Sequence, residues 1–134
     1  MKFPPVRCDP KPIQKPGPPI LLGARGPRAI ERVVRTYDGW VQIAGKPQSL
    51  KRDVDALRKV AADRDRNPDT LSISAFIAPT EDGISMEDLQ RYKEGGADRF
   101  VLFSQSDAIK MAAGKTLEIV RRLAPTVERA DHIK

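Results

Sequence analysis

Cysteine and histidine are almost absent from this chain of 134 residues, which has one of each, Cys8 and His132. A single cysteine cannot form a disulfide within the chain, and one thiol with one imidazole is too little for a soft-metal cluster. A long apolar run is also lacking, and residues 1–10 contain neither a hydrophobic signal-peptide region nor a cleavage site. We therefore expect a cytoplasmic protein without a membrane span.

Charge is plentiful, and its positive excess lies in the first half of the chain. The net charge is +6: residues 1–26 have five basic and one acidic side chain, residues 27–66 have ten and six, and the remainder has nine and eleven. These charges are interspersed on amphipathic helices, which is typical of a solvated surface, and they can also attract a phosphorylated ligand. A nucleic-acid-binding protein is the least favoured class, because no basic stripe is interleaved with aromatic residues. We expect neither nucleic acid nor membrane as a partner.

Residues 18–40 contain the pattern around which the chain is organised. An apolar run at residues 20–22, bounded by prolines and a glycine, predicts a strand buried on both faces of a parallel sheet. Pro27 suits the first position of a helix, where its missing N–H costs nothing. The glycine turn at residues 23–26 then points the N–H groups of a helix N-terminus beyond the strand, as in anion-binding sites. The apolar residues of this helix recur at helical spacing: Ile30, Val33, Val34 and Tyr37.

The rest of the chain alternates between strand and helix patterns. We predict strands at residues 39–43, 71–78 and 98–103, and helices at residues 49–65, from Ser85 through Tyr92, and from Asp107, loosened at Gly114, to Pro125. Four strand–helix pairs with short loops predict an α/β fold with parallel pairing and right-handed crossovers. The chain divides into a Pro-rich extended segment, residues 1–18, and a (βα)4 domain, residues 19–134.

Four short segments, taken in their order along the chain, form a recognisable pattern. They read Lys11-Pro-Ile-Gln-Lys-Pro, Ile20-Leu-Leu-Gly-Ala-Arg-Gly-Pro, Tyr37-Asp-Gly-Trp and Gly95-Gly-Ala-Asp-Arg-Phe-Val-Leu. Together they resemble the C-terminal half of the luciferase-like flavin- and deazaflavin-dependent oxidoreductases. The resemblance implies four parallel βα units from a TIM (β/α)8 barrel, and flavin mononucleotide (FMN) or the deazaflavin coenzyme F420 as the cofactor.

The resemblance also implies site residues. In the family the cofactor phosphate is held by backbone N–H groups of the glycine turn, which here comprises Gly23, Ala24, Arg25 and Gly26. Members of the family often have a second glycine at Ala24, so the contact requires a negative φ or strain at that residue. Lys46 matches a lysine that contacts substrate phosphate in sugar-phosphate dehydrogenases of the family. The alternatives are that the turn only joins strand to helix and that Lys46 is only a solvated charge.

The motif at residues 37–40 suggests structural roles. We expect Asp38 to accept backbone hydrogen bonds at the exit of the helix, and Trp40 to pack in the barrel. The N-terminal half of such a barrel supplies most of the isoalloxazine pocket and the usual acid–base groups, so we assign no catalytic residue. We expect the isolated chain to be inactive, with or without bound cofactor.

Two hypotheses for function remain open. The chain is either an oxidoreductase half-barrel completed by a second half, or a non-enzymatic half-barrel that binds a phosphorylated ligand or acts as an assembly module. The second half is either another copy or a separately encoded N-terminal half-barrel. Two unpaired strand edges, at residues 20–22 and 100–103, and one uncovered sheet face favour a homodimer that closes the barrel. The uncovered face contains one of two rows of the third strand: Leu71, Ile73, Ala75 and Ile77, or Ser72, Ser74, Phe76 and Ala78.

Overall fold

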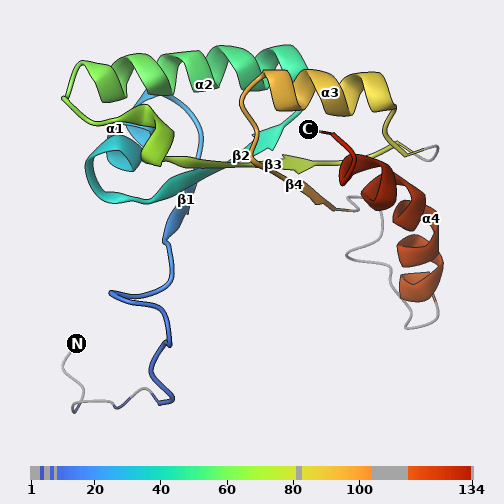
Figure 1. Ribbon diagram of the computed structural model, residues 1–134, viewed down its shortest axis with the longest axis horizontal. Helices are drawn as coiled ribbons and strands as arrows, with labels where there is room; N and C mark the ends of the chain where they lie inside the picture. The colour runs from blue at the N-terminus through green and yellow to red at the C-terminus, as the bar shows by residue number, and fades with distance from the viewer. Residues whose placement is uncertain (1–3, 5–6, 8, 81–82, 104–114, 134) are drawn as a thin grey trace.

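The structure, a computed structural model, describes residues 4, 7, 9–80, 83–103 and 115–133. Within these residues strands and helices alternate (Figure 1). The elements are β1 (Leu21–Gly23), α1 (Pro27–Thr36), β2 (Gly39–Ala44), α2 (Pro47–Ala62), the 3-10 helix η1 (Pro68–Thr70), β3 (Ser72–Ile77), α3 (Met86–Glu94), β4 (Arg99–Leu102) and α4 (Lys115–Ala130). The strands form one parallel sheet in the order β1-β2-β3-β4, which confirms the predicted α/β fold. Its four parallel βα units correspond to half of a TIM barrel.

The Pro-rich segment stands apart from this sheet. Its described part at residues 9–19 forms neither helix nor strand, and it extends away from β1 in Figure 1. None of the described helices is long and apolar enough to cross a membrane.

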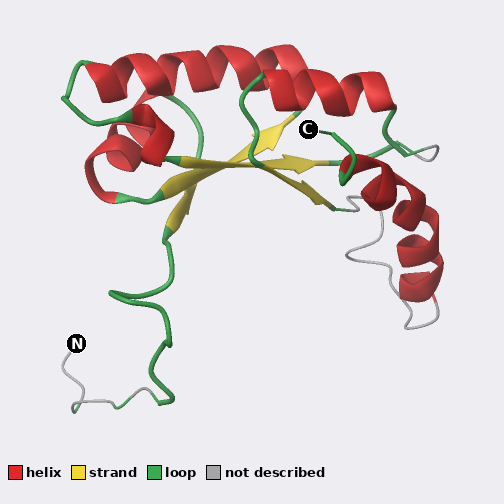
Figure 2. Cartoon of the chain, in the orientation of Figure 1, coloured by secondary structure: helices red, strands yellow, loops and turns green. Residues whose placement is uncertain are grey.

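The hydrophobic core lies between the sheet and its helices. Figure 2 shows α1, α2 and α3 on one side of the sheet. On β2 and β3, the side chains of Trp40 and Ile73 are register partners and both belong to this core. The row of β3 that faces the helices is therefore the apolar one. Its members are Leu71, Ile73, Ala75 and Ile77. They are buried together with residues of the three helices: Ile30, Val33, Val34, Leu50, Val54, Leu57, Leu89 and Tyr92.

The opposite side of the sheet is covered by no helix of the described residues, and we call it the open face. Alternation along the strands assigns to it Leu21, Val41, Ile43, Ser72, Ser74, Phe76, Arg99 and Val101. Ile43 is 48% exposed, and the ring of Phe76 lies 5.9 Å from that of Phe103. In a complete barrel this face would be the inner wall.

The prediction of a first strand buried on both faces is wrong. The strand is Leu21–Gly23 instead of residues 20–22, and Ile20 is 62% exposed. The reason is that β1 is an edge strand, with helices on one side and the open face on the other. The continuous apolar run resembled a central strand because a barrel would cover both faces of β1.

Two aspartates connect the beginnings of neighbouring strands. The Asp38 carboxylate accepts a hydrogen bond from the Ile20 N–H at 2.8 Å, and the Asp98 carboxylate accepts one from the Ile73 N–H at 2.7 Å. The predicted structural role of Asp38 is thus confirmed. Gly39 follows Asp38 because the chains approach closely there: an added Cβ would lie 2.2 Å from the Ser72 carbonyl oxygen.

The N-cap of α3 follows the signal predicted from the sequence, whereas the beginning of α2 was predicted two residues too late. The Ser85 hydroxyl accepts a hydrogen bond from the Asp88 N–H at 3.0 Å, so the predicted N-cap of α3 is confirmed. Helix α2, predicted at residues 49–65, begins at Pro47 and ends at Ala62. Pro47 occupies the first helical turn for the same reason as Pro27 in α1.

The prediction that the last helix ends at Pro125 is wrong. Helix α4 continues through Pro125 to Ala130, although proline lacks an N–H and disfavours a helix interior. Packing outweighs this cost: Thr126 is buried, and Ala130 and Ile133 pack against the core. On the predicted apolar face, Leu117 and Val120 are 55% and 58% exposed. The predicted beginning at Asp107 and loosening at Gly114 lie outside the described residues.

Candidate anion-binding site

The turn between β1 and α1 leaves backbone donors free. Gly26 precedes the helix with φ 86° and ψ 175°, a conformation that is essentially restricted to glycine. No side chain caps this end of α1, and Pro27 has no N–H. Among the described residues, no backbone or side-chain oxygen accepts a hydrogen bond from the backbone N–H of Arg25, Gly26 or Arg28. These donors lie at the positive end of the helix dipole, where an anion is favoured.

Two long-range hydrogen bonds fix the shape of this turn. The Trp40 indole N–H donates to the Ala24 carbonyl oxygen at 2.8 Å, and the Arg25 guanidinium donates to the Ile43 carbonyl oxygen at 2.8 Å. Ala24 keeps an ordinary backbone, since Asp65 is the one described non-glycine residue with a positive φ. An alanine at this position therefore causes no backbone strain in the turn.

A cavity of about 580 Å³ opens beside the turn. It lies between the N-terminal halves of α1 and α2, at the carboxyl ends of β1 and β2. Its lining comprises Arg25, Gly26, Pro27, Ile30, Trp40, Gln42, Ile43, Gly45, Ser49, Arg52, Asp53 and Ala56. Two arginines against one aspartate, together with the positive ends of two helix dipoles, make its polar rim attractive to an anion.

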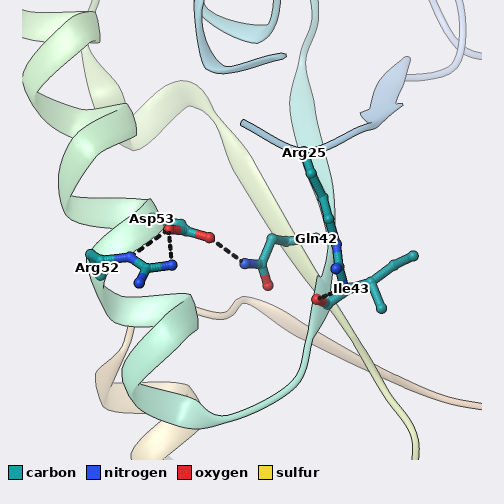
Figure 3. A network of polar contacts seen from close by, with 5 residues as sticks. All are labelled: Arg25, Gln42, Ile43, Arg52 and Asp53. Carbon is teal, nitrogen blue, oxygen red and sulfur yellow. Dashed lines mark hydrogen bonds and ion pairs between the residues drawn. The ribbon is translucent and has the colours of Figure 1, made fainter. Parts of the chain in front are cut away.

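A polar pair crosses the cavity from β2 to α2 (Figure 3). The Gln42 amide nitrogen donates to one Asp53 carboxylate oxygen at 2.7 Å, and the other oxygen accepts from the Arg52 guanidinium at 3.0 Å. Gln42 is only 3% exposed, and its Oε1 has no hydrogen-bond partner. We did not predict this pair from the sequence. The available signal was the glutamine itself, which lies between Trp40 and Ala44 in a row that faces the helices.

The structure brings together only part of the predicted site. Arg25 and Gly26 line the cavity, whereas Gly23, Ala24 and Lys46 do not. Lys46 is exposed and occupies the N-cap position of α2, where its carbonyl oxygen accepts the Ser49 N–H at 3.0 Å. It follows Gly45, which is a lining residue, so it stands next to the rim of the cavity.

A second cavity, of about 440 Å³, lies at the carboxyl end of β3. Tyr92 and Arg129 are among its lining residues. Burial, with a smaller contribution from the Asp88 carboxylate, raises the pKa of Tyr92 above its ordinary value. Within the described ranges, no three side chains of His, Cys, Asp or Glu are grouped so as to hold a metal ion.

Comparison with known proteins adds one match that covers most of the chain. A family model described as luciferase-like monooxygenase matches residues 2–129. A search of curated proteins found no match.

Proposed function

The chain belongs to the luciferase-like monooxygenase family, and from this premise we propose that its Gly23–Gly26 turn holds the phosphate of a flavin or deazaflavin cofactor. The family generally uses these cofactors, which is why an oxidoreductase is the best functional class. The observation that carries the proposal is the set of free N–H groups at the beginning of α1, next to a cavity lined by Arg25 and Gly26. FMN and coenzyme F420 both have a phosphate whose oxygens can accept hydrogen bonds from these N–H groups.

The local residues fit such a phosphate. An ideal Cβ at Gly23 or Gly26 would meet no atom within 4 Å, so the space beside the turn is open to a ligand. Arg25 stays close to the turn because one of its nitrogen atoms is bound to the Ile43 carbonyl oxygen, and its other N–H groups can pair with phosphate oxygens. Lys46 is our candidate for the phosphate of a substrate at the adjacent rim.

The bound cofactor would supply the redox chemistry. The residues of this chain would bind and orient it through its phosphate, and we assign no acid–base role to any of them. Positioning and proton transfer normally contribute much of an enzyme's rate. We therefore expect cofactor binding without turnover for the four-strand unit alone, which is also what the non-enzymatic alternative predicts.

Completion of the barrel is the second part of the proposal. Three features lack a partner within the described chain: the outer edges of β1 and β4, the exposed Ile43 side chain on the open face, and the exposed Leu117 and Val120 side chains on α4. A second half-barrel would cover all three at once. We propose a homodimer in which β1 of each copy pairs with β4 of the other, because a two-fold axis closes both seams with the same contact. A separately encoded N-terminal half-barrel is the alternative.

Charge reversal at α1 tests the phosphate site. Arg28 is the second residue of the helix, and Arg35 lies in its last turn, roughly 10 Å away at 1.5 Å per residue. We expect Arg28→Glu to weaken the binding of FMN or coenzyme F420 by about tenfold or more, because the new charge competes with the phosphate for the same donors. The matched control Arg35→Glu should change the affinity by less than about twofold, because salt screens charges over that distance.

A loss of folding stability cannot explain weaker cofactor binding by Arg28→Glu than by Arg35→Glu. A negative charge favours a helix N-terminus and disfavours a C-terminus, so Arg28→Glu should be the more stable of the two variants. Equal affinities of both variants, measured by absorbance and fluorescence titration, would contradict the phosphate site. An absorbance scan of freshly purified protein would in addition identify any cofactor that remains bound.

Light scattering coupled to size exclusion tests the homodimer. We expect about twice the 14.9 kDa of one chain at micromolar concentration. Val101→Asp introduces a charge on the open face at edge strand β4 and should produce a monomer, whereas Ile13→Asp, at a residue that is 96% exposed, should not. A mass near 14.9 kDa for the unmodified protein would contradict the homodimer and leave the separately encoded partner.

A further inference from the structure

The edge strand β4 borders an apolar cavity far from the glycine turn in the order of the sheet. The cavity, of about 250 Å³, lies on the helix side of the sheet, between β4, α3 and α4. Most of its apolar lining residues are only partly buried, and Val127 is 50% exposed. An apolar side chain that entered the cavity would remove this surface from water. The apolar lining residues are Leu89, Phe100, Leu102, Val127, Ala130 and Ile133.

The other edge strand, β1, has the complementary feature. Ile20 directly precedes β1, and its carbonyl oxygen accepts the Asp38 N–H at 2.9 Å, so it continues the pairing of β1 with β2. Leu22 packs against the core, and because side chains alternate along an extended chain, Ile20 projects to the same helix side. It is nevertheless 62% exposed. An apolar side chain on β1 and an apolar cavity on β4 thus lie on the same side of the sheet, at its two opposite edges.

The geometry of a closed barrel would bring these two features together. A row of register partners leads from Gly23 on β1 through β2 and β3 to Arg99 on β4. In an eight-stranded barrel of shear 8, such a row returns to its first strand displaced by eight residues, so each of two identical halves contributes four. Arg99 then lies opposite Pro19 of the second copy, and Phe100 lies opposite Ile20 of the second copy. The reverse displacement would set β1 against the end of α3, which excludes it.

We infer that Ile20 of a second copy fills the cavity between β4, α3 and α4, and that the two-fold axis repeats this contact at the other seam. The inference rests on the proposed homodimer and identifies the side chain that anchors each seam. Phe100 lines the cavity and packs against the core, so it faces the helices as Ile20 does. The same register sets Leu21 of the second copy opposite Val101 on the open face. Apolar side chains therefore meet on both sides of the joined sheet.

Truncation of Ile20 tests the contact by sedimentation equilibrium of the full chain. Ile20→Ala should raise the dimer dissociation constant by about 100-fold or more, because about tenfold is lost at each of two identical contacts. The matched control Ile13→Ala, at a residue of the Pro-rich segment that is 96% exposed, should change the constant by less than about twofold. If Ile20→Ala dimerised as tightly as the unmodified protein, the inference would be overturned while the homodimer stood. A monomeric unmodified protein would overturn both.

Cysteine cross-linking tests the register itself. With the single cysteine removed by Cys8→Ser, Ile20→Cys and Phe100→Cys place two Cα atoms about 4.8 Å apart across the seam, a distance that a disulfide spans. Within one chain these residues lie on opposite edges of the sheet, so the disulfide must join two copies. We expect mild oxidation to give a covalent dimer.

The matched control for the register combines Ile20→Cys with Leu102→Cys. This pair is displaced by two residues, so its Cα atoms would lie about 8 Å apart, beyond the reach of a disulfide. The control should therefore cross-link poorly. A control pair that cross-linked as well as the predicted pair, or a predicted pair that did not cross-link in a dimeric protein, would overturn the inference.

Discussion

Arg66 should be the most important charged residue for the stability of α1. Its guanidinium lies beyond the C-terminal end of this helix and donates hydrogen bonds to the carbonyl oxygens of Val33, Val34 and Tyr37, at 3.2, 2.6 and 2.7 Å. The last carbonyl groups of a helix lack intrahelical partners, and Val34 is among them, whereas the Val33 oxygen also accepts the Tyr37 N–H at 3.0 Å. A positive charge there also complements the negative end of the helix dipole.

The expected magnitude follows from these contacts. Hydrogen bonds to a charged group contribute about 1.5–3 kcal/mol, but three bonds from one side chain are not additive, so we expect Arg66→Met to lower the free energy of unfolding by about 2–3 kcal/mol. Methionine retains the apolar part of the side chain, so the loss reports the guanidinium itself. Arg66→Lys should recover only part of it, because an ammonium cannot reach three carbonyl oxygens as a planar fork does.

Arg64 supplies the control. It forms an ion pair with Glu31 of the same helix, and both side chains are 48% exposed. Exposed pairs contribute at most about 1 kcal/mol, so Arg64→Met should cost little. Urea unfolding followed by circular dichroism measures both variants. If the two lost equal stability, within about 0.5 kcal/mol, the assignment of Arg66 as the cap of α1 would be refuted.

Two further predictions concern the core. Gly39→Ala should destabilise the protein by about 3 kcal/mol or more, because its Cβ would meet the Ser72 backbone. The control Gly45→Ala, whose Cβ would meet no atom within 4 Å, should lower the free energy of unfolding by less than about 1 kcal/mol. Chemical unfolding of both variants tests this prediction. Burial and Asp88 raise the pKa of Tyr92, so the unfolded chain ionises first and stability should fall as pH rises above about 10. Tyr92→Phe should make the urea midpoint less dependent on pH between 8 and 11; an unchanged dependence would be evidence against this role.

Local patterns predicted most of the fold. The helical spacing of Ile30, Val33 and Val34 and the proline at position 27 define α1, and Ser85 defines the beginning of α3. These signals depend on neighbours in sequence, which is why they can be read without coordinates. The same rule would have predicted the beginning of α2 had Pro47 been treated like Pro27.

Long-range contacts account for what the sequence did not predict. Arg66 binds carbonyl groups 29 to 33 residues away, and no local pattern marks it as a helix cap. The helix continues through Pro125 because the residues after it are needed for packing. At the site, the turn was predictable from its glycines, but the cavity depends on how α1 and α2 pack, and Gln42 gained its importance only from the position of Asp53.

The binding of a phosphorylated cofactor at the beginning of α1 is the central claim, and amide chemical shifts test it most directly. In the ¹H–¹⁵N spectrum of the full chain titrated with FMN or coenzyme F420, we predict saturable shifts of the Arg25, Gly26 and Arg28 backbone amides. The Arg35 amide, at the other end of the same helix, should stay in place. Saturable binding that shifted other amides but left these three unchanged, or no binding of either cofactor, would contradict the account.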